Sequence, residues 1–169
     1  MHWGHAISKD LVHWQTLPIA LYPKGSDFIF SGSALIDFEN VTGYQTRDNE
    51  IQTMLAVFTA NNDQTHTQSQ WMAYSNDEGL NWKYFENNPI IANPKVRDFR
   101  DPKVFKYNDL FVVVLAVGDH IQVYNSKDLK HWTFSSEFGQ GQGSHQGVWE
   151  CPDLFPLDLK INGYIILRN

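Results

Sequence analysis

The sequence predicts an all-β protein, and three observations favour that class. Apolar residues alternate with polar ones at period 2 far more often than at the 3.6-residue period of a helix. The 11 glycines and 7 prolines are spread along the whole chain, as expected for turns between many short strands. No stretch longer than about two helical turns combines helix caps with an apolar stripe.

The first three predicted strands are alternating runs that end where turn residues begin. The second stops at Asn61-Asn62-Asp63 and the third at Asp77-Glu78-Gly79, both of which favour chain reversal. The first strand contains a glycine within an otherwise apolar run. These strands cover residues 28–37, 52–60 and 69–76.

Five further strands are predicted in the second half of the chain. The clearest hairpin joins two of them through Asn108-Asp109, and Gly118-Asp119 marks the next turn. The last two are short apolar runs, one around Cys151 and one near the C-terminal end. The five strands cover residues 101–107, 110–117, 120–126, 148–154 and 163–168.

A seven-residue motif recurs along the chain. Residues 8–14, Ser-Lys-Asp-Leu-Val-His-Trp, return at 126–132 with six of seven residues identical, and Ser75 to Trp82 is a looser copy. Each copy follows an apolar strand and supplies Ser and Asp side chains that accept hydrogen bonds within a hairpin turn. We expect the tryptophan of each copy, Trp14, Trp82 and Trp132, to re-enter the sheet and pack in its core.

The spacing of this motif predicts a β-propeller. Its tryptophans are 68 and 50 residues apart, and a repeat of about 50 to 70 residues holds roughly four strands, the size of one blade with its loops. The chain then holds about two and a half blades of four-stranded antiparallel sheet, whereas a closed propeller needs at least four. We therefore expect residues 1–169 to be a fragment of one propeller domain. The alternative is that a Ser-x-Asp turn before Trp recurs by chance.

Composition excludes several classes of partner and site. Basic side chains number 13 against 19 acidic ones, for a net charge of −6, and no basic patch favours nucleic acid or an anionic membrane. Cys151 is the only cysteine, which excludes a disulfide within the chain and a four-cysteine zinc site. The seven histidines are dispersed, so no metal site is expected. The longest apolar run, Leu110 to Val117, is far shorter than the roughly 20 residues of a membrane helix, and no signal peptide is visible, so a soluble chain is expected.

Two acidic residues stand in contexts that favour acid–base chemistry. Asp101 follows Arg100, whose positive charge favours the ionised form of a carboxyl group. Glu150 lies between Trp149 and Cys151, which are expected to strip it of water and to favour its protonated form. One charged and one protonatable carboxyl group is the pair that glycoside hydrolysis requires. The alternative is that both motifs only mark strand starts, with Arg100 and Asp101 as a surface ion pair.

A third feature is the sequence Ser31-Gly32-Ser33 inside a predicted strand. A glycine within a strand often marks the close approach of a ligand or of another backbone. Small hydroxyl residues on both sides of it add hydrogen-bonding groups to that place.

Five motifs follow one another in order through most of the chain. They are His2-Trp3-Gly4-His5-Ala6 continuing into residues 8–14, Leu17-Pro18-Ile19-Ala20-Leu21-Tyr22-Pro23, Phe30-Ser31-Gly32-Ser33-Ala34, Phe99-Arg100-Asp101-Pro102-Lys103-Val104 and Trp149-Glu150-Cys151-Pro152-Asp153-Leu154. Together they resemble glycoside hydrolase family 32, which contains invertases, levanases and exo-inulinases.

The resemblance implies a five-bladed propeller whose funnel-shaped pocket binds a terminal β-D-fructofuranosyl unit of sucrose or a fructan, which is cleaved with retention of configuration. By motif position Glu150 resembles the general acid/base, and Asp101 resembles the residue that stabilises the transition state. No metal or organic cofactor is implied. The positions that match the fructose-binding subsite are Arg100, Phe30, Ser31 and Cys151.

The chain departs from the family pattern at the nucleophile. In the family the nucleophilic Asp lies in an Asn-Asp-Pro-Asn-Gly motif upstream of the stretch that matches His2-Trp3-Gly4-His5, and no such motif occurs here. The Gln and Trp that usually complete the sugar pocket upstream are missing as well. We therefore expect this chain alone to be inactive, and its parent protein to hydrolyse sucrose, levan or inulin.

Two other functions stay open at this point. One is a non-catalytic fructan-binding or regulatory relative, which upstream coding sequence without the nucleophile motif would favour. The other is a sialidase-type propeller, suggested by Ser75 to Trp82, which predicts an Arg triad and a catalytic Tyr that the sequence does not show. Residues 37–45 and Gly147-Val148 are more similar to exo-fructanases and secreted invertases, which favours an extracellular parent protein. The sequence makes no prediction of oligomeric state.

Overall fold

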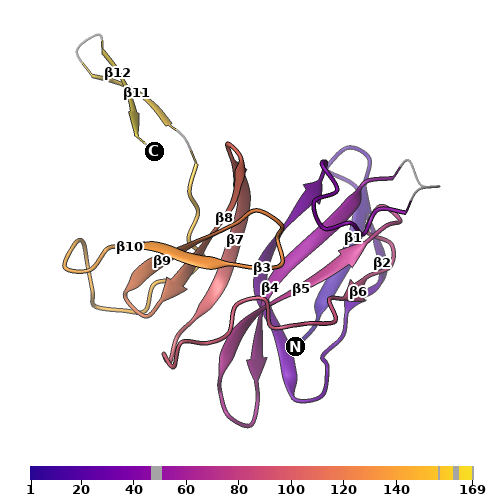
Figure 1. Cartoon of the computed structure of the whole chain (residues 1–169). Coiled ribbons are helices and arrows are strands. Elements are labelled where there is room, and N and C mark those ends of the chain that lie inside the picture. Colours follow the sequence, from indigo (N-terminus) through magenta and orange to yellow (C-terminus); the bar gives the residue numbers. More distant parts are fainter. Residues whose placement is uncertain (47–50, 156, 162–163, 169) are drawn as a thin grey trace.

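The computed structural model describes residues 1–46, 51–155, 157–161 and 164–168, and every helix or strand in these residues is a β-strand (Figure 1). The predicted all-β class is confirmed. Within this part of the chain no helix could span a membrane. The strands are β1 (Trp3–Ser8), β2 (Trp14–Leu21), β3 (Asp27–Asp37), β4 (Thr53–Asn62), β5 (Gln68–Ser75), β6 (Lys83–Tyr84), β7 (Arg100–Tyr107), β8 (Leu110–Val117), β9 (His120–Ser126), β10 (Thr133–Phe138), β11 (Leu157–Ile161) and β12 (Tyr164–Arg168).

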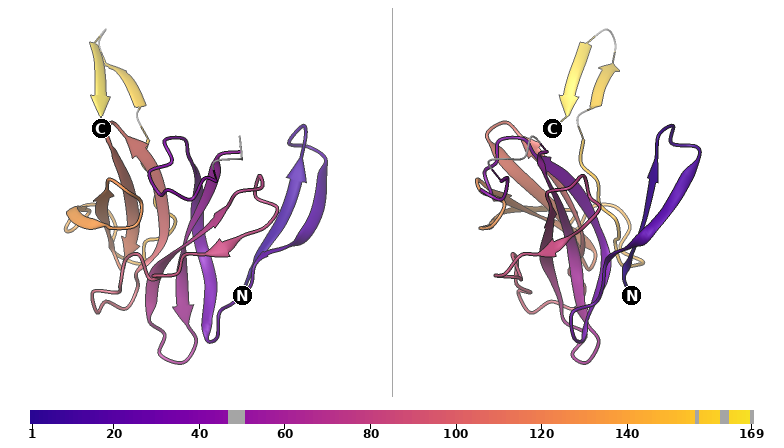
Figure 2. Two further views of the ribbon diagram at one scale, coloured as in Figure 1. Left: turned by 45° about the vertical axis from the view of Figure 1, so that its right-hand side comes forward. Right: turned by 90° about the vertical axis from the view of Figure 1, so that its right-hand side faces the viewer.

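The strands form two four-stranded antiparallel sheets and two separate hairpins. One sheet has the order β3-β4-β5-β6 and the other the order β10-β9-β8-β7, while β1 pairs with β2 and β11 pairs with β12. The first strand of each sheet, β3 or β7, therefore lies at one edge, and the chain meanders outwards from it as in a propeller blade. The β11–β12 hairpin stands away from both sheets, and β1–β2 extends beside the β3–β6 sheet (Figure 2). The predicted partial propeller is confirmed, as two blades with a hairpin on each side.

Six predicted strands agree with β3, β4, β5, β7, β8 and β9 to within two residues at each end. The strand predicted at 163–168 agrees with β12, and residue 163 lies outside the described residues. The strand predicted at 148–154 is wrong. Cys151 has a positive φ of 48° and Pro152 has no N–H to donate, and the N–H groups of Trp149 and Cys151 bond to the Gly118 carbonyl and the Asp101 side chain instead of to a neighbouring strand.

The main hydrophobic core lies between the two four-stranded sheets. Buried side chains of β4 and β5, such as Val57 and Met72, pack in one cluster with Phe99, Val113 and Leu115 from the neighbouring blade. A smaller cluster on the other face of the first sheet gathers around Phe58. Strand β4 is thus buried on both faces, which explains its nearly continuous apolar sequence.

The edge strands β3 and β7 are joined by Ser33. Its hydroxyl donates to the Pro102 carbonyl at 2.8 Å and accepts the Val104 N–H at 2.8 Å. Pro102 lies at a register break in β7, between Arg100 and Lys103, whereas Val104 follows the break and is in register with Val113 of β8. One side chain therefore satisfies two backbone groups at the free edge of β7 and fixes one blade against the next.

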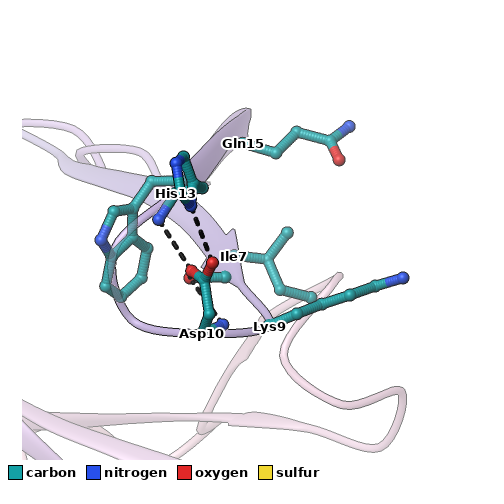
Figure 3. A pocket seen from close by; sticks show the side chains of 7 residues that line it. Ile7, Lys9, Asp10, His13 and Gln15 are labelled. Atoms are coloured by element: carbon teal, nitrogen blue, oxygen red, sulfur yellow. Dashed lines mark hydrogen bonds and ion pairs between the residues drawn. The ribbon is translucent and has the colours of Figure 1, made fainter.

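The recurring motif builds a hairpin turn in which the Asp carboxylate is the central acceptor. Asp10 Oδ1 accepts the N–H groups of Val12 and His13 at 2.9 and 2.8 Å. Its Oδ2 lies 2.7 Å from the His13 ring, and Figure 3 shows the Asp10 side chain against His13. The second copy repeats the arrangement, with Asp128 holding Lys130 and His131. The predicted turn role of the motif is confirmed.

The tryptophans of the three copies differ in their packing. Trp82 and Trp132 are partly buried against the two core clusters, as expected. Trp14 is 58% exposed, so the expectation of core packing is wrong for this copy. The reason is that β1 and β2 form a two-stranded sheet, which offers no second layer of strands to cover the ring.

The two turn aspartates have lowered pKa values. For Asp10 the backbone N–H of His13 is the main cause, followed by the His13 ring. For Asp128 burial acts to raise the pKa, but the hydrogen bonds from the ring and backbone of His131 and from the Lys130 N–H outweigh it. Both side chains are therefore carboxylates in the folded protein at neutral pH.

Replacing Asp128 by Ala is expected to lower the free energy of unfolding by about 1 kcal/mol at pH 7, because two turn N–H groups lose their acceptor. A carboxyl group whose pKa is lowered by folding stabilises the fold above its unfolded pKa of about 4, and this contribution is lost as the pH falls below that value. The difference between Asp128→Ala and the unchanged chain should therefore shrink below pH 4. Urea denaturation followed by tryptophan fluorescence at several pH values measures both effects.

Asp109→Ala is the matched control for this change, because Asp109 is an exposed turn residue between β7 and β8. It should leave stability unchanged. Equal stability of the two variants at pH 7 would contradict the role assigned to the Asp128 turn.

Candidate functional site

All six residues that the sequence singled out line one cleft of about 330 Å³. They come from three segments that are distant in sequence, namely β3, the start of β7 and the segment after β10. Met1 and Gln68 complete the lining. The residues brought together are Phe30, Ser31, Arg100, Asp101, Glu150 and Cys151.

Asp101 occupies an unusual backbone conformation at the start of β7. Its φ is +60°, a value that costs free energy for a residue with a side chain. The register break removes its N–H from the β8 ladder, and that N–H donates instead to Thr59 Oγ1 at 3.0 Å. The Asp101 residue is 8% exposed, with its side chain at the cleft.

A buried polar clamp from β4 and β5 holds the backbone just before Asp101. Thr59 Oγ1, which accepts the Asp101 N–H, donates to Gln70 Oε1 at 2.8 Å. Gln70 Nε2 donates to the Phe99 carbonyl at 2.8 Å, and the Phe99 N–H donates to Gln68 Oε1 at 2.8 Å. Backbone groups on both sides of Arg100 are thus fixed by side chains of the neighbouring blade.

None of the sequence motifs includes Thr59, Gln68 or Gln70. The available signal was that Thr59 and Gln70 are polar residues inside predicted strands, whereas Gln68 comes one residue before a predicted strand and carried no such signal. Thr59 and Gln70 are fully buried, and Gln68 is 7% exposed. Buried polar groups of this kind need partners, and here the partners are backbone atoms of β7 and the residue before it.

The segment that carries Glu150 is irregular and is tied to the second blade at several points. The Trp149 N–H donates to the Gly118 carbonyl at 2.7 Å, and the Cys151 N–H donates to Asp101 Oδ2 at 2.9 Å. Further along, Asp153 pairs with Lys103 at 3.0 Å. These contacts with β7 and with the β8–β9 turn hold Glu150 in position. The segment forms no strand of its own.

Arg100 links two carboxylates at the cleft. Its guanidinium donates to Asp98 at 2.6 Å and to Glu150 at 3.1 Å, and its side chain is 13% exposed. Burial acts to lower the pKa of Arg100, but the hydrogen bonds to Asp98 and Glu150 outweigh it and raise the pKa. Because Asp101 is buried and bonds to Cys151 rather than to Arg100, a surface Arg100–Asp101 ion pair does not describe the site.

The expected desolvation of Glu150 is not found in this chain. The Glu150 side chain is 63% exposed. Trp149 does not cover it, because the indole turns to stack on His145 and donates to the Ser144 carbonyl at 3.0 Å. Glu150 is therefore a carboxyl group at an open face of the cleft, in contact with Arg100.

The Cys151 thiol lies 3.8 Å from Asp101 Oδ2. The negative charge of Asp101 is the main cause that raises the pKa of this thiol, and burial adds to it. Cys151 is therefore a neutral thiol near pH 7, which presents a small polarizable surface to the cleft rather than a thiolate nucleophile.

Gly32 lies beside Ser31 at a second register break, in β3. A Cβ atom on Gly32 would lie 2.2 Å from the Val57 carbonyl oxygen and 2.6 Å from Phe58 Cα. Of the two explanations that the sequence left open for this glycine, close approach of another backbone is the one that the structure supports. The neighbour is strand β4.

Other clefts of larger volume do not bring two carboxyl groups together, although two of them are lined by several polar side chains. A cleft of about 790 Å³ beside β7 and β8 is lined mainly by apolar residues such as Phe105, Val112 and Phe155. Among the described residues no three His, Cys, Asp or Glu side chains gather as a metal site would require. The chemistry that the Asp101–Glu150 cleft can perform is proton transfer by Glu150 and acceptance of hydrogen bonds by a fixed Asp101 carboxylate.

Comparison with known proteins agrees with the family resemblance. The sequence model of the glycosyl hydrolases family 32 N-terminal domain matches residues 1–167. A levanase of Bacillus subtilis (strain 168) is 54% identical over 164 residues, which are 96% of this chain and 24% of the levanase. The crystal structure of an exo-inulinase from Aspergillus awamori superimposes with a TM-score of 0.85 at 36% identity, over 97% of this chain and 36% of the inulinase.

A fructofuranosidase from Schwanniomyces occidentalis, solved in complex with fructose, superimposes with a TM-score of 0.84 at 34% identity, over 97% of this chain and 32% of that chain. The chain thus spans a quarter to a third of the length of these relatives.

Replacing Thr59 by Val is expected to lower the free energy of unfolding by about 1–3 kcal/mol, because the Asp101 N–H and Gln70 Oε1 each lose a buried partner. Thr59→Ser keeps the hydroxyl, so its free energy of unfolding should fall by less. Urea denaturation of the two variants measures the difference, with Thr133→Val on the exposed strand β10 as the control. If Thr59→Val were as stable as Thr59→Ser, the clamp would not hold Asp101 in place.

Proposed function

Because the chain belongs to glycosyl hydrolase family 32, we propose that residues 1–169 form part of one catalytic propeller domain that removes terminal β-D-fructofuranosyl units from sucrose or from fructans such as levan and inulin. The observation that carries this proposal is the single cleft in which Asp101, Glu150 and Arg100 meet. The names of the relatives, a levanase, an exo-inulinase and a fructofuranosidase bound to fructose, support the substrate class.

Glu150 is the proposed general acid and base. As an acid it would protonate the glycosidic oxygen while the bond from that oxygen to the anomeric carbon breaks, and as a base it would then take a proton from the attacking water. Its place at an open face of the cleft leaves room for the leaving group. The contact with Arg100 fixes the carboxyl group on the cleft side of its segment.

Asp101 is the proposed stabiliser of the transition state. Its Oδ2 is occupied by the Cys151 N–H, and among the described residues nothing donates to its Oδ1, which is left to accept hydroxyl groups of the sugar. Positive charge develops on the fructosyl ring as the glycosidic bond breaks, so a fixed carboxylate interacts more strongly with the transition state than with the substrate. Arg100, Phe30, Ser31 and Cys151 are proposed to line the fructose-binding subsite around it.

The double displacement also needs a nucleophile, and the family's Asn-Asp-Pro-Asn-Gly motif does not occur in this sequence. Without a nucleophile no covalent fructosyl-enzyme can form, and Glu150 alone cannot complete the reaction. We therefore assign the activity to a whole protein in which another segment supplies the nucleophile. An extracellular location of that protein is proposed on the model of the relatives named extracellular exo-inulinase.

In the whole protein, Glu150→Gln and Asp101→Asn are each expected to lower kcat by roughly 10²–10⁴-fold with a smaller change in KM, since both side chains act mainly in the transition state. A fructoside with a leaving group of low pKa should restore the first step in Glu150→Gln but not in Asp101→Asn. Steady-state kinetics on sucrose, levan and the activated fructoside measure this, with Asp109→Asn as the control. A large change in KM at unchanged kcat would reassign the residue to substrate binding.

The purified chain of residues 1–169 is expected to release no fructose above background from sucrose, levan or inulin, because it lacks the nucleophile motif. A fructose assay on the chain, run beside the whole protein, tests this. If the chain released fructose and Glu150→Gln abolished that release, the expectation of an inactive chain would be contradicted. No release by the whole protein would instead favour the non-catalytic fructan-binding function.

A further inference from the structure

Gln68 is a buried side chain at the candidate site that neither the sequence motifs nor the proposed mechanism uses. It is the first residue of β5, is 7% exposed and lines the cleft beside Asp101 and Glu150. Its backbone pairs with Asn61 in β4, and its carbonyl accepts from Asn93 Nδ2 at 2.7 Å. The backbone position of Gln68 is therefore fixed on two sides.

The orientation of the Gln68 amide follows from its contact with Phe99. A backbone N–H can only donate, so the group that meets the Phe99 N–H at 2.8 Å must be the amide oxygen, Oε1. The amide nitrogen, Nε2, then points the other way. In the described part of the chain no acceptor meets Nε2, and Nε2 is not among the buried atoms without a partner, so it opens onto the cleft that Gln68 lines.

The amide nitrogen of Gln68 adds a donor to a cleft whose charged groups are mostly acceptors or already paired, beside the Ser31 hydroxyl. The two carboxyl groups of the cleft, Asp101 and Glu150, accept hydrogen bonds, and the Cys151 N–H is already bound to Asp101. Arg100 directs its terminal nitrogens to Asp98 and Glu150. A sugar presents hydroxyl and ring oxygens that accept as well as hydroxyl groups that donate, so a fixed neutral N–H pair complements the acceptors.

We propose that Gln68 is a further substrate-binding residue, whose amide nitrogen donates to an oxygen of the sugar in the cleft while its amide oxygen holds the Phe99 backbone. The identity of the ligand rests on the proposed function, whereas the orientation of the amide does not. Because the side chain is already held by Phe99, the donor is placed before the sugar arrives and little side-chain entropy is lost on binding.

Two variants separate the binding role from the structural one. Gln68→Glu keeps an oxygen for the Phe99 N–H but has no N–H donors, and Gln68→Met removes both groups without adding a charge. Gln15→Glu, on the exposed strand β2, is the control for added charge. In the whole protein, KM for sucrose and levan, the inhibition constant of free D-fructose, and hydrogen exchange of the Phe99 amide are measured for each.

Both Gln68 variants are expected to raise KM and the fructose inhibition constant by roughly three- to tenfold, the loss of about one hydrogen bond, while kcat changes less. Exchange at Phe99 should accelerate only in Gln68→Met. Unchanged constants in both variants would overturn the proposal, and so would a change confined to Gln68→Met together with faster exchange, since that pattern describes a purely structural residue.

The same proteins distinguish a failure of the proposed function from a failure of this inference. If the unchanged whole protein releases no fructose from sucrose, levan or inulin, the proposed function fails, and calorimetric binding of D-fructose then decides the role of Gln68. Weaker binding by both Gln68 variants would support the role. Equal binding by all proteins, or no binding by the unchanged protein, would overturn it.

Discussion

The backbone conformation of Asp101 is the constraint on which the rest of the candidate site depends. A left-handed φ at a non-glycine residue persists only where surrounding contacts over-determine it. Here the contacts are the Thr59 hydroxyl on its N–H and the two glutamines that hold Phe99. With that conformation fixed, the carboxylate reaches the Cys151 N–H, and the segment that carries Glu150 is placed in turn.

The blades are joined next to the register break that frees Asp101. Ser33 bonds to the carbonyl of Pro102, inside the break, and to the N–H of Val104, which follows it. Regular sheet pairing supplies the frame, and the break leaves the Asp101 N–H to bond with Thr59 of the other blade. The six site residues that the sequence predicted accordingly come from the register breaks of β3 and β7 and from a segment without strand structure.

Local pattern was sufficient to predict most of the fold. Period-2 alternation located all but the last strand of each four-stranded sheet, because these strands bury side chains against a neighbour. It also located β12, but it predicted none of β1, β2, β6, β10 and β11, and all six residues of β10 are exposed. It was wrong at residues 148–154, which form a loop that is hydrogen-bonded to β7 and to the β8–β9 turn. In the site, motifs identified the residues that face the cleft but not Thr59, Gln68 and Gln70. Those three act on backbone atoms about 30 to 40 residues away in sequence, and no local pattern encodes such a contact.

Residue types alone would have identified the wrong place as catalytic. Asp10 lies within hydrogen-bonding distance of both Ser8 and His13, and the group recurs at Ser126, Asp128 and His131. In a hydrolytic triad the histidine stands between the serine and the aspartate, so that it can take the serine proton. Here the aspartate stands between the other two and accepts from both, and the His13 and His131 side chains are 86% and 87% exposed. Such a turn binds its own backbone N–H groups, whereas the Asp101 carboxylate keeps an oxygen free towards a cleft. That difference in what the carboxylate faces is why we assign a structural role to the turn aspartates and propose a catalytic role for Asp101 alone.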